Sequence, residues 1–435
     1  MTPRELRRLD RELNSFLDGM TASMGRPERR SSMGLYVTGL LLDGERKSMQ
    51  PMAARLVADA SQVEAMRQRL QECVVISSWS DEEMYRRLAR KLDRELPGIE
   101  ALVVDDTGIP KKGKFSVGVA RQYSGTLGRV DNCQVGVSLH LAGEAGSGCI
   151  AFELFVPKEW MDDPSRLAKA GVPDGLPART KIQIALGQID RALADGVRRH
   201  VVLADAGYGD STEFRGGLSA RGLLYVVGVN GQPVVWPPES DPQIPPKQPG
   251  LKGQQKTRYR DDDHPPEAIG DLGRRLSFRK VTWREGTRGK QSSRFAAVRI
   301  RTAHHHVRSA PPGEEQWLLV EWPDGEDAPT KHWLSNLPAT TSVVALVRIA
   351  KMRWRVERDY QDLKGELGLD HFEGRTWRGF HHHATLCAVA HGFLALQRAL
   401  FPPEEAEVDA SASPSPSATG GSVEAGLVSA VLQAS

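Results

Sequence analysis

Cysteine is scarce in this sequence, and the four copies are scattered. None of Cys73, Cys133, Cys149 and Cys387 has a partner at CxxC spacing. This pattern is typical of reduced thiols and argues against a structural zinc site. We therefore expect neither disulfides nor a cysteine-bound metal.

Long apolar runs are absent as well. No stretch approaches the roughly 18 residues that span a bilayer, and the first residues, Met1 to Glu5, lack the apolar core of a secretory signal. We therefore expect a cytoplasmic protein with no membrane partner.

A strong overall charge is missing too. The 435 residues carry a formal net charge of only +3, and their 40% apolar and 26% charged residues are typical of globular proteins. One segment differs, because residues 251–308 contain 15 Lys and Arg against 6 Asp and Glu. Such an excess suits a surface that faces nucleic acid, although a solvated basic face explains it equally well.

The length allows two or three domains, and the pattern of the sequence changes along it. Residues 1–97 have amphipathic helical spacing and no convincing strand pattern, and Pro97-Gly98 ends this section. We interpret residues 1–97 as a helical region for DNA binding or dimerisation.

Short apolar runs that predict buried strands begin at residue 101. Residues 101–104 and 200–204 are two such runs, and each ends directly before an aspartate, Asp105 and Asp205. Further strands are predicted at 134–141, 149–156 and 223–229, and a helix at 180–194. Strands that alternate with helices predict an α/β fold, with a mixed sheet flanked by helices over residues 98–229.

Three later segments complete the predicted organisation. Residues 230–340 follow a polar and apolar alternation after a Pro-rich connection, so we interpret them as a β-rich insertion. Residues 341–402 return to helical spacing and rejoin the main fold. The Ser, Ala, Pro and Gly-rich tail, residues 403–435, is expected to be disordered.

One stretch within residues 341–402 carries the most informative charges. An apolar stripe over residues 349–367 predicts a single amphipathic helix, and Glu357 lies beside that stripe. Arg353 comes four residues before Glu357 and Lys364 seven residues after it, so the three side chains project from roughly one face. This arrangement suits a metal ion next to groups that hold phosphate, but a surface helix with salt bridges has the same pattern.

Asp105, Asp205 and Glu357 are the candidate catalytic and metal-binding residues. Buried carboxylates that converge repel one another unless a cation lies between them. Oxygen ligands without cysteine favour Mg²⁺ or Mn²⁺, and two such ions can activate a water and stabilise the leaving oxygen in phosphodiester cleavage. For a single acid, the alternative is a residue that caps the next turn.

The order of these acids resembles that of the DDE transposases of bacterial insertion sequences, members of the DDE endonuclease superfamily with an RNase H-like core. The first acid of that family commonly stands in Asp-x-Thr after the first core strand, and Asp105-Asp106-Thr107 matches this pattern. The second acid ends the fourth strand, as Asp205 does. Asp106 competes with Asp105 for the role of first acid, and the Asp-x-Thr pattern favours Asp105.

The third acid of the family stands in a signature of Tyr, Arg, Glu and Lys. Arg353, Glu357 and Lys364 reproduce its last three members at the family's spacing, which makes the two cations candidate DNA ligands. The tyrosine position is Ala350 here, so any contact of that tyrosine with DNA is lost or moved.

The resemblance implies a transposase for cut-and-paste DNA transposition that uses two Mg²⁺ or Mn²⁺ ions. Such an enzyme cleaves DNA at the transposon end, and the freed 3′-hydroxyl attacks the opposite strand or the target. The implied partners are double-stranded DNA with terminal inverted repeats, target DNA and a second copy of the chain, in a protein associated with the bacterial nucleoid. The alternatives are a non-catalytic DNA-binding protein derived from a transposase by domestication or decay, and a nuclease that cuts without joining.

Further candidates for DNA binding come from the surroundings of these acids. Trp283, beside Arg284 in the basic segment, could stack on an unpaired base of a hairpinned DNA end, although a tryptophan buried between strands is the alternative. Lys111, Lys112 and Lys114 follow the first acid and are either phosphate ligands or a solvated loop.

Two runs of three histidines lie at residues 304–306 and 381–383. Adjacent residues direct their side chains apart on a helix or strand. We therefore interpret both runs as histidines that bind no metal.

Overall fold

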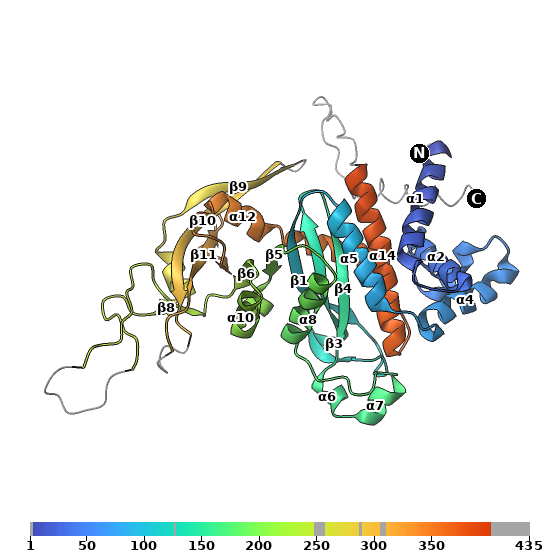
Figure 1. Cartoon of the computed structure of the whole chain (residues 1–435), viewed down its shortest axis with the longest axis horizontal. Helices are drawn as coiled ribbons and strands as arrows, with labels where there is room; N and C mark the ends of the chain where they lie inside the picture. Colours follow the sequence, from blue (N-terminus) through green and yellow to red (C-terminus); the bar gives the residue numbers. More distant parts are fainter. Residues whose placement is uncertain (1–2, 126–127, 248–256, 287–288, 305–309, 402–435) are drawn as a thin grey trace. The chain divides into compact units, whose positions relative to one another are not determined.

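The computed structural model describes residues 3–125, 128–247, 257–286, 289–304 and 310–401 (Figure 1). The chain divides into two compact units. Unit 1 contains residues 1–99, 106–198 and 355–435, and unit 2 contains residues 100–105 and 199–354. Strand β1 (Ile99–Pro110) contributes residues to both units.

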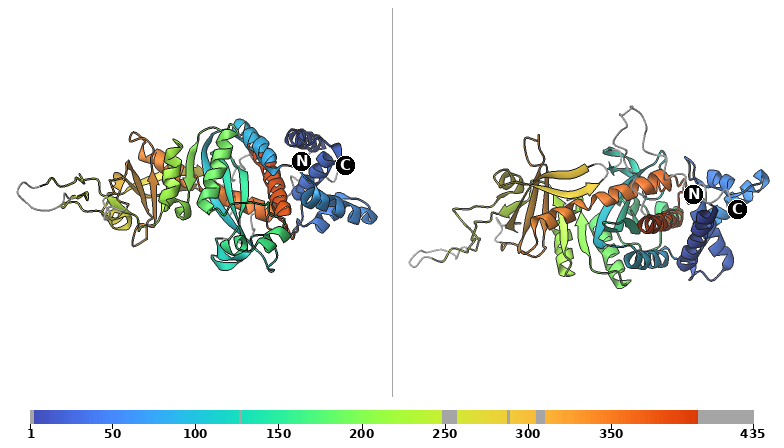
Figure 2. Two further views of the ribbon diagram at one scale, coloured as in Figure 1. Left: turned by 60° about the horizontal axis from the view of Figure 1, so that its bottom comes forward. Right: turned by 90° about the horizontal axis from the view of Figure 1, so that it is seen from above.

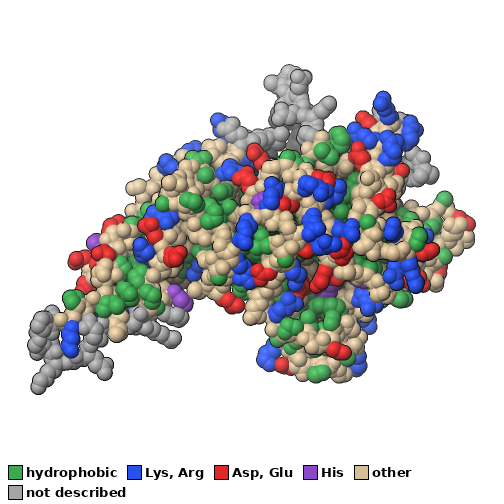
Figure 3. All heavy atoms as spheres, in the orientation of Figure 1, with side chains coloured by type: hydrophobic (Ala, Val, Ile, Leu, Met, Phe, Trp, Pro, Cys, Tyr) green, Lys and Arg blue, Asp and Glu red, His purple; other side chains and the backbone are tan. Residues whose placement is uncertain are grey.

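Helices form the first part of unit 1, as the spacing of residues 1–97 predicts. They are α1 (Pro3–Thr21), α2 (Pro27–Leu41), α3 (Met49–Leu56), α4 (Val63–Gln71) and α5 (Asp81–Glu95), with a 3₁₀ turn at Ala60–Gln62 and a π turn at Glu72–Ile76. At the start of α5 the Ser80 hydroxyl accepts a hydrogen bond from the Glu83 amide, which caps the helix. Glu83 also pairs with Arg87 one turn later. On the face drawn in Figure 3, basic and acidic side chains are interleaved in this way.

Three antiparallel strands form a sheet in unit 1. They are β2 (Ala120–Ser124), β3 (Arg129–Gly143) and β4 (Ser147–Phe155); the first part of β3 pairs with β2 and the rest of it with β4. Val137, Leu139 and Leu154 are among the apolar side chains of these strands that are fully buried. The strands predicted at 134–141 and 149–156 are thereby confirmed.

Four helices follow or cover this sheet: α6 (Lys158–Met161), α7 (Pro164–Lys169), α8 (Lys181–Ala194) and α14 (Trp377–Leu400). α8 begins where the sequence predicts, because Thr180 and Gln183 form a capping box at its start. α14 packs against β4, α2 and α5, and it lies along α5 in Figures 1 and 2. Since α14 is buried nearly all round, its sequence shows no amphipathic stripe.

The sheet of unit 2 begins with parallel strands. Residues 101–103 of β1 pair in parallel with β5 (Val201–Ala204), and β5 pairs in parallel with β6 (Tyr225–Val229). Residues 101–104 are essentially inaccessible to solvent. Strands that are covered on both faces have continuous apolar runs, which is why the sequence alone identified them.

Antiparallel strands then extend the same sheet in the order β6, β12, β11, β10, β7, β8, with β9 also paired to β10. These are β7 (Val234–Trp236), β8 (Glu267–Ala268), β9 (Arg279–Gly286), β10 (Gly289–Thr302), β11 (Glu315–Trp322) and β12 (Lys331–Ser335). The helices of unit 2 are α9 (Ala206–Gly209), α10 (Thr212–Ala220), α11 (Ile269–Arg274) and α12 (Val343–Lys351). The segment read as β-rich therefore continues the sheet of β5 and β6.

The single helix predicted over residues 349–367 is wrong. α12 ends at Lys351, α13 spans Trp354–Gln361, and a π turn follows at Asp362–Glu366. At the break, the Met352 amide donates to the Ile349 carbonyl, three residues back. No proline or glycine marks this break and the apolar spacing continues across it, so periodicity could not reveal it.

These elements confirm the predicted fold class: a mixed sheet flanked by helices, consistent with an RNase H-like fold, with a helical N-terminal region. The division into five regions remains a prediction. None of the helices in the described ranges combines the length and apolar character that a bilayer crossing requires.

Candidate active site

Two aspartates follow the paired part of neighbouring parallel strands in unit 2. The pairing of β1 with β5 ends with Val103 opposite Leu203. Asp105 and Asp205 each come two residues later. Because side chains two residues apart in an extended chain lie on the same face, both carboxylates project from one face at the carboxyl ends of the paired segments.

The position of Asp105 differs in one respect from the prediction. The sequence indicated a strand that ends at residue 104, whereas β1 continues to Pro110. Asp105 thus lies within a strand. The Asp-Asp-Thr-Gly sequence has low strand propensity, which hid the continuation.

Arg353 holds the carboxylate of Asp105. Its Nη1 lies 2.8 Å from Asp105 Oδ2, and the Asp105 side chain is only 13% exposed. A guanidinium at this distance forms a charge-assisted hydrogen bond to the carboxylate. Arg353 therefore acts on the first candidate acid within unit 2.

Asp106 has a different partner. Its Oδ2 lies 3.0 Å from Lys181 Nζ, at the start of α8. Successive residues of a strand direct their side chains to opposite faces, so Asp105 and Asp106 are separated by β1 itself. The sequence analysis missed Lys181, because a lone lysine at a helix start carries no distinguishing signal.

Asp205 caps the helix that follows it. Its Oδ1 accepts hydrogen bonds from the Gly207 amide at 2.9 Å and the Tyr208 amide at 3.4 Å, at the start of α9. The alternative considered for a single acid, a residue that caps the next turn, therefore applies to Asp205. Capping through one oxygen is compatible with metal binding, because a carboxylate has about four acceptor sites.

Glu357 lies in the first turn of α13, in unit 1, and its side chain is exposed. Lys364 lies in the π turn, where its ammonium donates to the Gly108 carbonyl at 2.9 Å and burial lowers its pKa. The backbone changes from α to π geometry at Asp362, between Glu357 and Lys364, and their shared face stays a prediction.

Ala350 occupies the place of the signature tyrosine and is 5% exposed on α12. A side chain at this buried position is poorly placed to contact DNA. The small Ala350 in place of the signature tyrosine thus agrees with the burial of this position.

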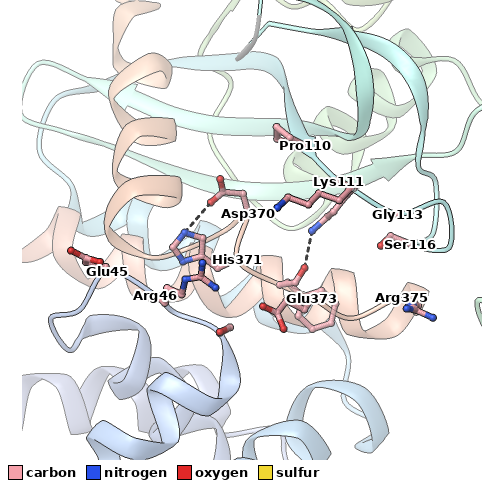
Figure 4. Close-up of a pocket in the computed structure, with 13 residues that line it drawn as sticks. Glu45, Arg46, Pro110, Lys111, Gly113, Ser116, Asp370, His371, Glu373 and Arg375 are labelled. Atoms are coloured by element: carbon pink, nitrogen blue, oxygen red, sulfur yellow. Dashed lines mark hydrogen bonds and ion pairs between the residues drawn. The ribbon is translucent and has the colours of Figure 1, made fainter.

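The three lysines after the first acid have unequal environments. Lys111 donates to the Phe372 carbonyl at 2.7 Å, and burial lowers its pKa (Figure 4). Lys112 and Lys114 are exposed. Lys112 also lines a cleft of about 530 Å³ in unit 1, together with Arg46 and other residues drawn in Figure 4. Lys112 and Lys114 are therefore the better candidates for phosphate.

Trp283 and Arg284 lie on β9 in unit 2. The Trp283 ring is half-buried, with Lys351 Nζ 4.5 Å from its centroid and the Phe295 ring edge-on at 5.7 Å. Arg284 is exposed and stacks on Trp354 at 4.3 Å. The surroundings of Trp283 favour the structural alternative, and its stacking on a DNA base remains a prediction.

The histidines at 381–383 are buried hydrogen-bonding residues of α14. His381 accepts from the Leu154 amide, and His383 bonds to the hydroxyl of Tyr36 and the carbonyl of Gly368. Burial is the main cause that lowers the pKa of His383 to about 4. In the first run, residues 305 and 306 lie outside the described residues. Within the described ranges, no group of three His, Cys, Asp or Glu side chains could hold a metal ion.

Comparison with known proteins identifies the family. Residues 17–290, more than half of the chain, match the model of the DDE superfamily endonucleases. The chain belongs to this family of DDE superfamily endonucleases. It is also 29% identical over 193 residues to a probable transposase for insertion sequence element IS701 from Microchaete diplosiphon. That match covers 44% of this chain and 46% of the relative, so the chain spans about half the length of the relative that it matches.

The DDE endonuclease match contains both aspartates but ends before Glu357. The roles of Asp105, Asp205 and Glu357 therefore stay predictions from the sequence, and only the two aspartates fall within the matched residues.

A divalent cation fits the donors that a DDE endonuclease presents here. Asp105 and Asp205 offer carboxylate oxygens two residues after the paired segments of β1 and β5, and hard oxygen ligands suit Mg²⁺ or Mn²⁺. No cysteine adjoins either residue in the sequence. The donor types therefore suit the expected metal, while the described residues gather no third acid around this pair.

Proposed function

We propose that this DDE endonuclease is a transposase that cleaves transposon-end DNA and transfers the cleaved strand to a target. The observation that carries the proposal is the pair Asp105 and Asp205, each of which comes two residues after the paired segments of β1 and β5. The family match and the insertion-sequence relative support the same reaction class.

In this proposal the catalytic acids are Asp105, Asp205 and Glu357. These acids would hold two Mg²⁺ or Mn²⁺ ions, which would supply an activated water and stabilise the leaving oxygen. Arg353 would orient the Asp105 carboxylate, whose Oδ2 lies 2.8 Å from its Nη1. Glu357 is exposed on the first turn of α13, where the helix dipole favours a carboxylate.

The proposed partners are double-stranded DNA with terminal inverted repeats, target DNA and a second copy of the chain. Exposed cations such as Lys112, Lys114 and Arg284 suit phosphate contacts, which give binding without base specificity. Strand transfer requires the 3′-hydroxyl freed by cleavage to attack a phosphorus of the second DNA, so that a new P–O bond forms while the bond from that phosphorus to the target's own 3′-oxygen breaks.

A nicking assay tests the proposal. Full-length protein is incubated with a labelled duplex that carries the flanking repeat of its own gene, with Mn²⁺, with Mg²⁺ or with EDTA, and the products are separated on a denaturing gel. We expect nicking at the repeat boundary with either metal and none with EDTA. Asp205→Asn and Glu357→Gln should each abolish nicking and leave DNA affinity within a few-fold, because basic residues carry the binding.

The outcomes separate the proposal from its alternative. Nicking that persists in Glu357→Gln would remove the third acid from the mechanism. A duplex that is bound and never cut would favour a non-catalytic descendant of a transposase. The observation that favours this non-catalytic alternative is the buried Ala350 at the position of the signature tyrosine.

A further inference from the structure

A cluster of polar side chains lies buried in unit 1, away from every acid assigned above. It joins α13 to the sheet and contains Ser138 and His140 of β3, Ser147 of β4, and Asp359 and Tyr360 of α13. Polar groups are costly to bury unless they are hydrogen-bonded to one another. The side chains of this cluster are linked to one another by hydrogen bonds from Tyr360 to Ser147.

The carboxylate of Asp359 is the centre of the cluster. Asp359 Oδ2 lies 2.6 Å from His140 Nδ1, and its Oδ1 accepts from the Ser147 hydroxyl at 2.5 Å. On its other side, His140 Nε2 lies 3.0 Å from the Ser138 hydroxyl, which lies 2.5 Å from the Tyr360 hydroxyl. Two adjacent residues of α13 are thereby tied to two strands.

The charge state of the cluster supports a strong contact. Burial lowers the pKa of His140, but Cys149 and the Asp359 carboxylate together outweigh it and raise that pKa to about 10. His140 Nδ1 and Asp359 Oδ2 lie at ion-pair distance, and both side chains are buried.

Ser138, His140 and Asp359 have the residue types and the hydrogen-bonding order of a nucleophilic triad. That role is excluded by burial, because Ser138 and His140 are 0% exposed and Asp359 is 3% exposed. A nucleophile must reach its substrate, and this serine cannot. The cluster must therefore act through the elements that it joins.

The element that it joins to the sheet is the helix that carries Glu357. Asp359 comes two residues after Glu357, and two helical residues are about 200° apart around the axis. The buried Asp359 thus fixes an inward face, and the exposed Glu357 lies on the opposite side. We infer that the buried cluster positions α13, fixing its rotation on β3 and β4 and hence the direction in which Glu357 projects.

The choice of polar residues supports this role. A well-packed apolar contact of the same size is often as stable as a buried ion pair, or more stable. Hydrogen bonds, unlike apolar contacts, are satisfied in only one arrangement of the helix on the sheet. The link to catalysis rests on the proposed function of Glu357, whereas the positioning of α13 does not.

Hydrogen exchange of the full chain, measured without DNA or metal, tests the positioning. Tyr360→Phe removes one hydroxyl and its contact with Ser138, which is worth about 1 kcal/mol and corresponds to roughly fivefold faster opening of α13. Asp359→Asn removes the ion pair and should accelerate exchange further. If Asp359→Asn does not fold, the exchange rates of Tyr360→Phe alone decide the test.

The matched control is Asp93→Asn. Asp93 is a buried carboxylate of the same unit, on α5, and it accepts from the amide and the guanidinium of Arg198. We expect this variant to leave exchange in α13 unchanged. Equal acceleration in the control, or no acceleration in Tyr360→Phe, would overturn the inference.

The nicking assay then tests the link to Glu357. We expect Tyr360→Phe to raise the half-saturating Mn²⁺ concentration several-fold at unchanged DNA affinity, because a helix that rotates presents its carboxylate less often. An unchanged Mn²⁺ requirement would remove that link. If the wild-type chain does not nick DNA at all, the proposed function fails, and the exchange measurement still decides whether the cluster positions α13.

Discussion

At the scale of single residues, Asp105 and Asp106 are neighbours in the chain with separate partners. Asp105 Oδ2 lies 2.8 Å from Arg353 Nη1, and Asp106 Oδ2 lies 3.0 Å from Lys181 Nζ. Both contacts are ion pairs, but Asp105 comes two residues after the β1–β5 pairing, as Asp205 does, whereas Asp106 comes three residues after it. The two acids can therefore be told apart by experiment.

We predict that Asp105→Asn abolishes metal-dependent nicking while Asp106→Asn retains it within a few-fold. The reason is that Asp106 projects to the opposite face and its half-exposed ion pair contributes at most about 1 kcal/mol to stability. Both variants should bind DNA normally. If Asp106→Asn lost nicking while Asp105→Asn stayed active, Asp106 and not Asp105 would be the first catalytic acid.

A second residue-scale prediction concerns Trp283. We expect Trp283→Ala to lower the midpoint of thermal unfolding, because its ring packs against Phe295 and holds the ammonium of Lys351. Trp283→Phe should retain most of the stability, since an aromatic ring remains. A selective loss of hairpinned DNA product at an unchanged midpoint would instead support base stacking by Trp283.

At the scale of elements, α9 is held tightly against β6. A Cβ atom at Gly209 would lie 1.9 Å from the Gly228 carbonyl oxygen, which is closer than such atoms can approach. Asp205 is the N-cap of α9, so a shift of this helix moves the second catalytic candidate.

We therefore predict that Gly209→Ala destabilises the protein by roughly 1–3 kcal/mol, as overpacking does. It should also reduce nicking, although it changes no charge. The matched control is Gly216→Ala on α10, where a Cβ atom would meet nothing within 4 Å. Urea unfolding should show the control equal to or slightly more stable than the wild type, and a similar loss in both variants would contradict the argument.

The elements also show what the sequence could and could not reveal. β5 and α8 were predictable because a continuous apolar run and a capping box are local signals. The extension of β1 to Pro110 and the break after Lys351 depend on contacts with distant residues, to which local propensity is blind. For the same reason the sequence singled out Asp105 and Asp106 as candidates. It could not assign Arg353 to Asp105 or Lys181 to Asp106.

At the scale of the whole molecule, buried histidines link stability to pH. The pKa of His383 is lowered to about 4 in the folded chain, below the ordinary value of 6.5. The unfolded state therefore binds more protons between these values, so the stability contributed by neutral His383 is complete above pH 6.5 and lost as the pH falls to 4. The stability contributed by His140 depends on pH in the opposite direction. Its pKa is raised in the folded chain, so its contribution is lost as the pH rises through about 10.

We predict that His383→Gln makes the fall in unfolding free energy between pH 6 and pH 4.5 shallower. One proton fewer is taken up on unfolding, which corresponds to about 1.4 kcal/mol per pH unit. Urea unfolding at several pH values measures this slope. The control His264→Gln replaces an exposed histidine and should keep the wild-type slope. The same slope in both variants would show that His383 is protonated in the native state.

The position of α14 in the chain has a consequence for how the protein is made. Its histidines contact segments as early as Tyr36, and β4, α2 and α5 pack on it, yet α14 is the last helix in the described part of the chain. During synthesis these earlier elements emerge from the ribosome long before Trp377–Leu400. A product of premature termination before Trp377 would keep both strand aspartates but leave the apolar faces of unit 1 uncovered, so we expect cellular proteases to remove it.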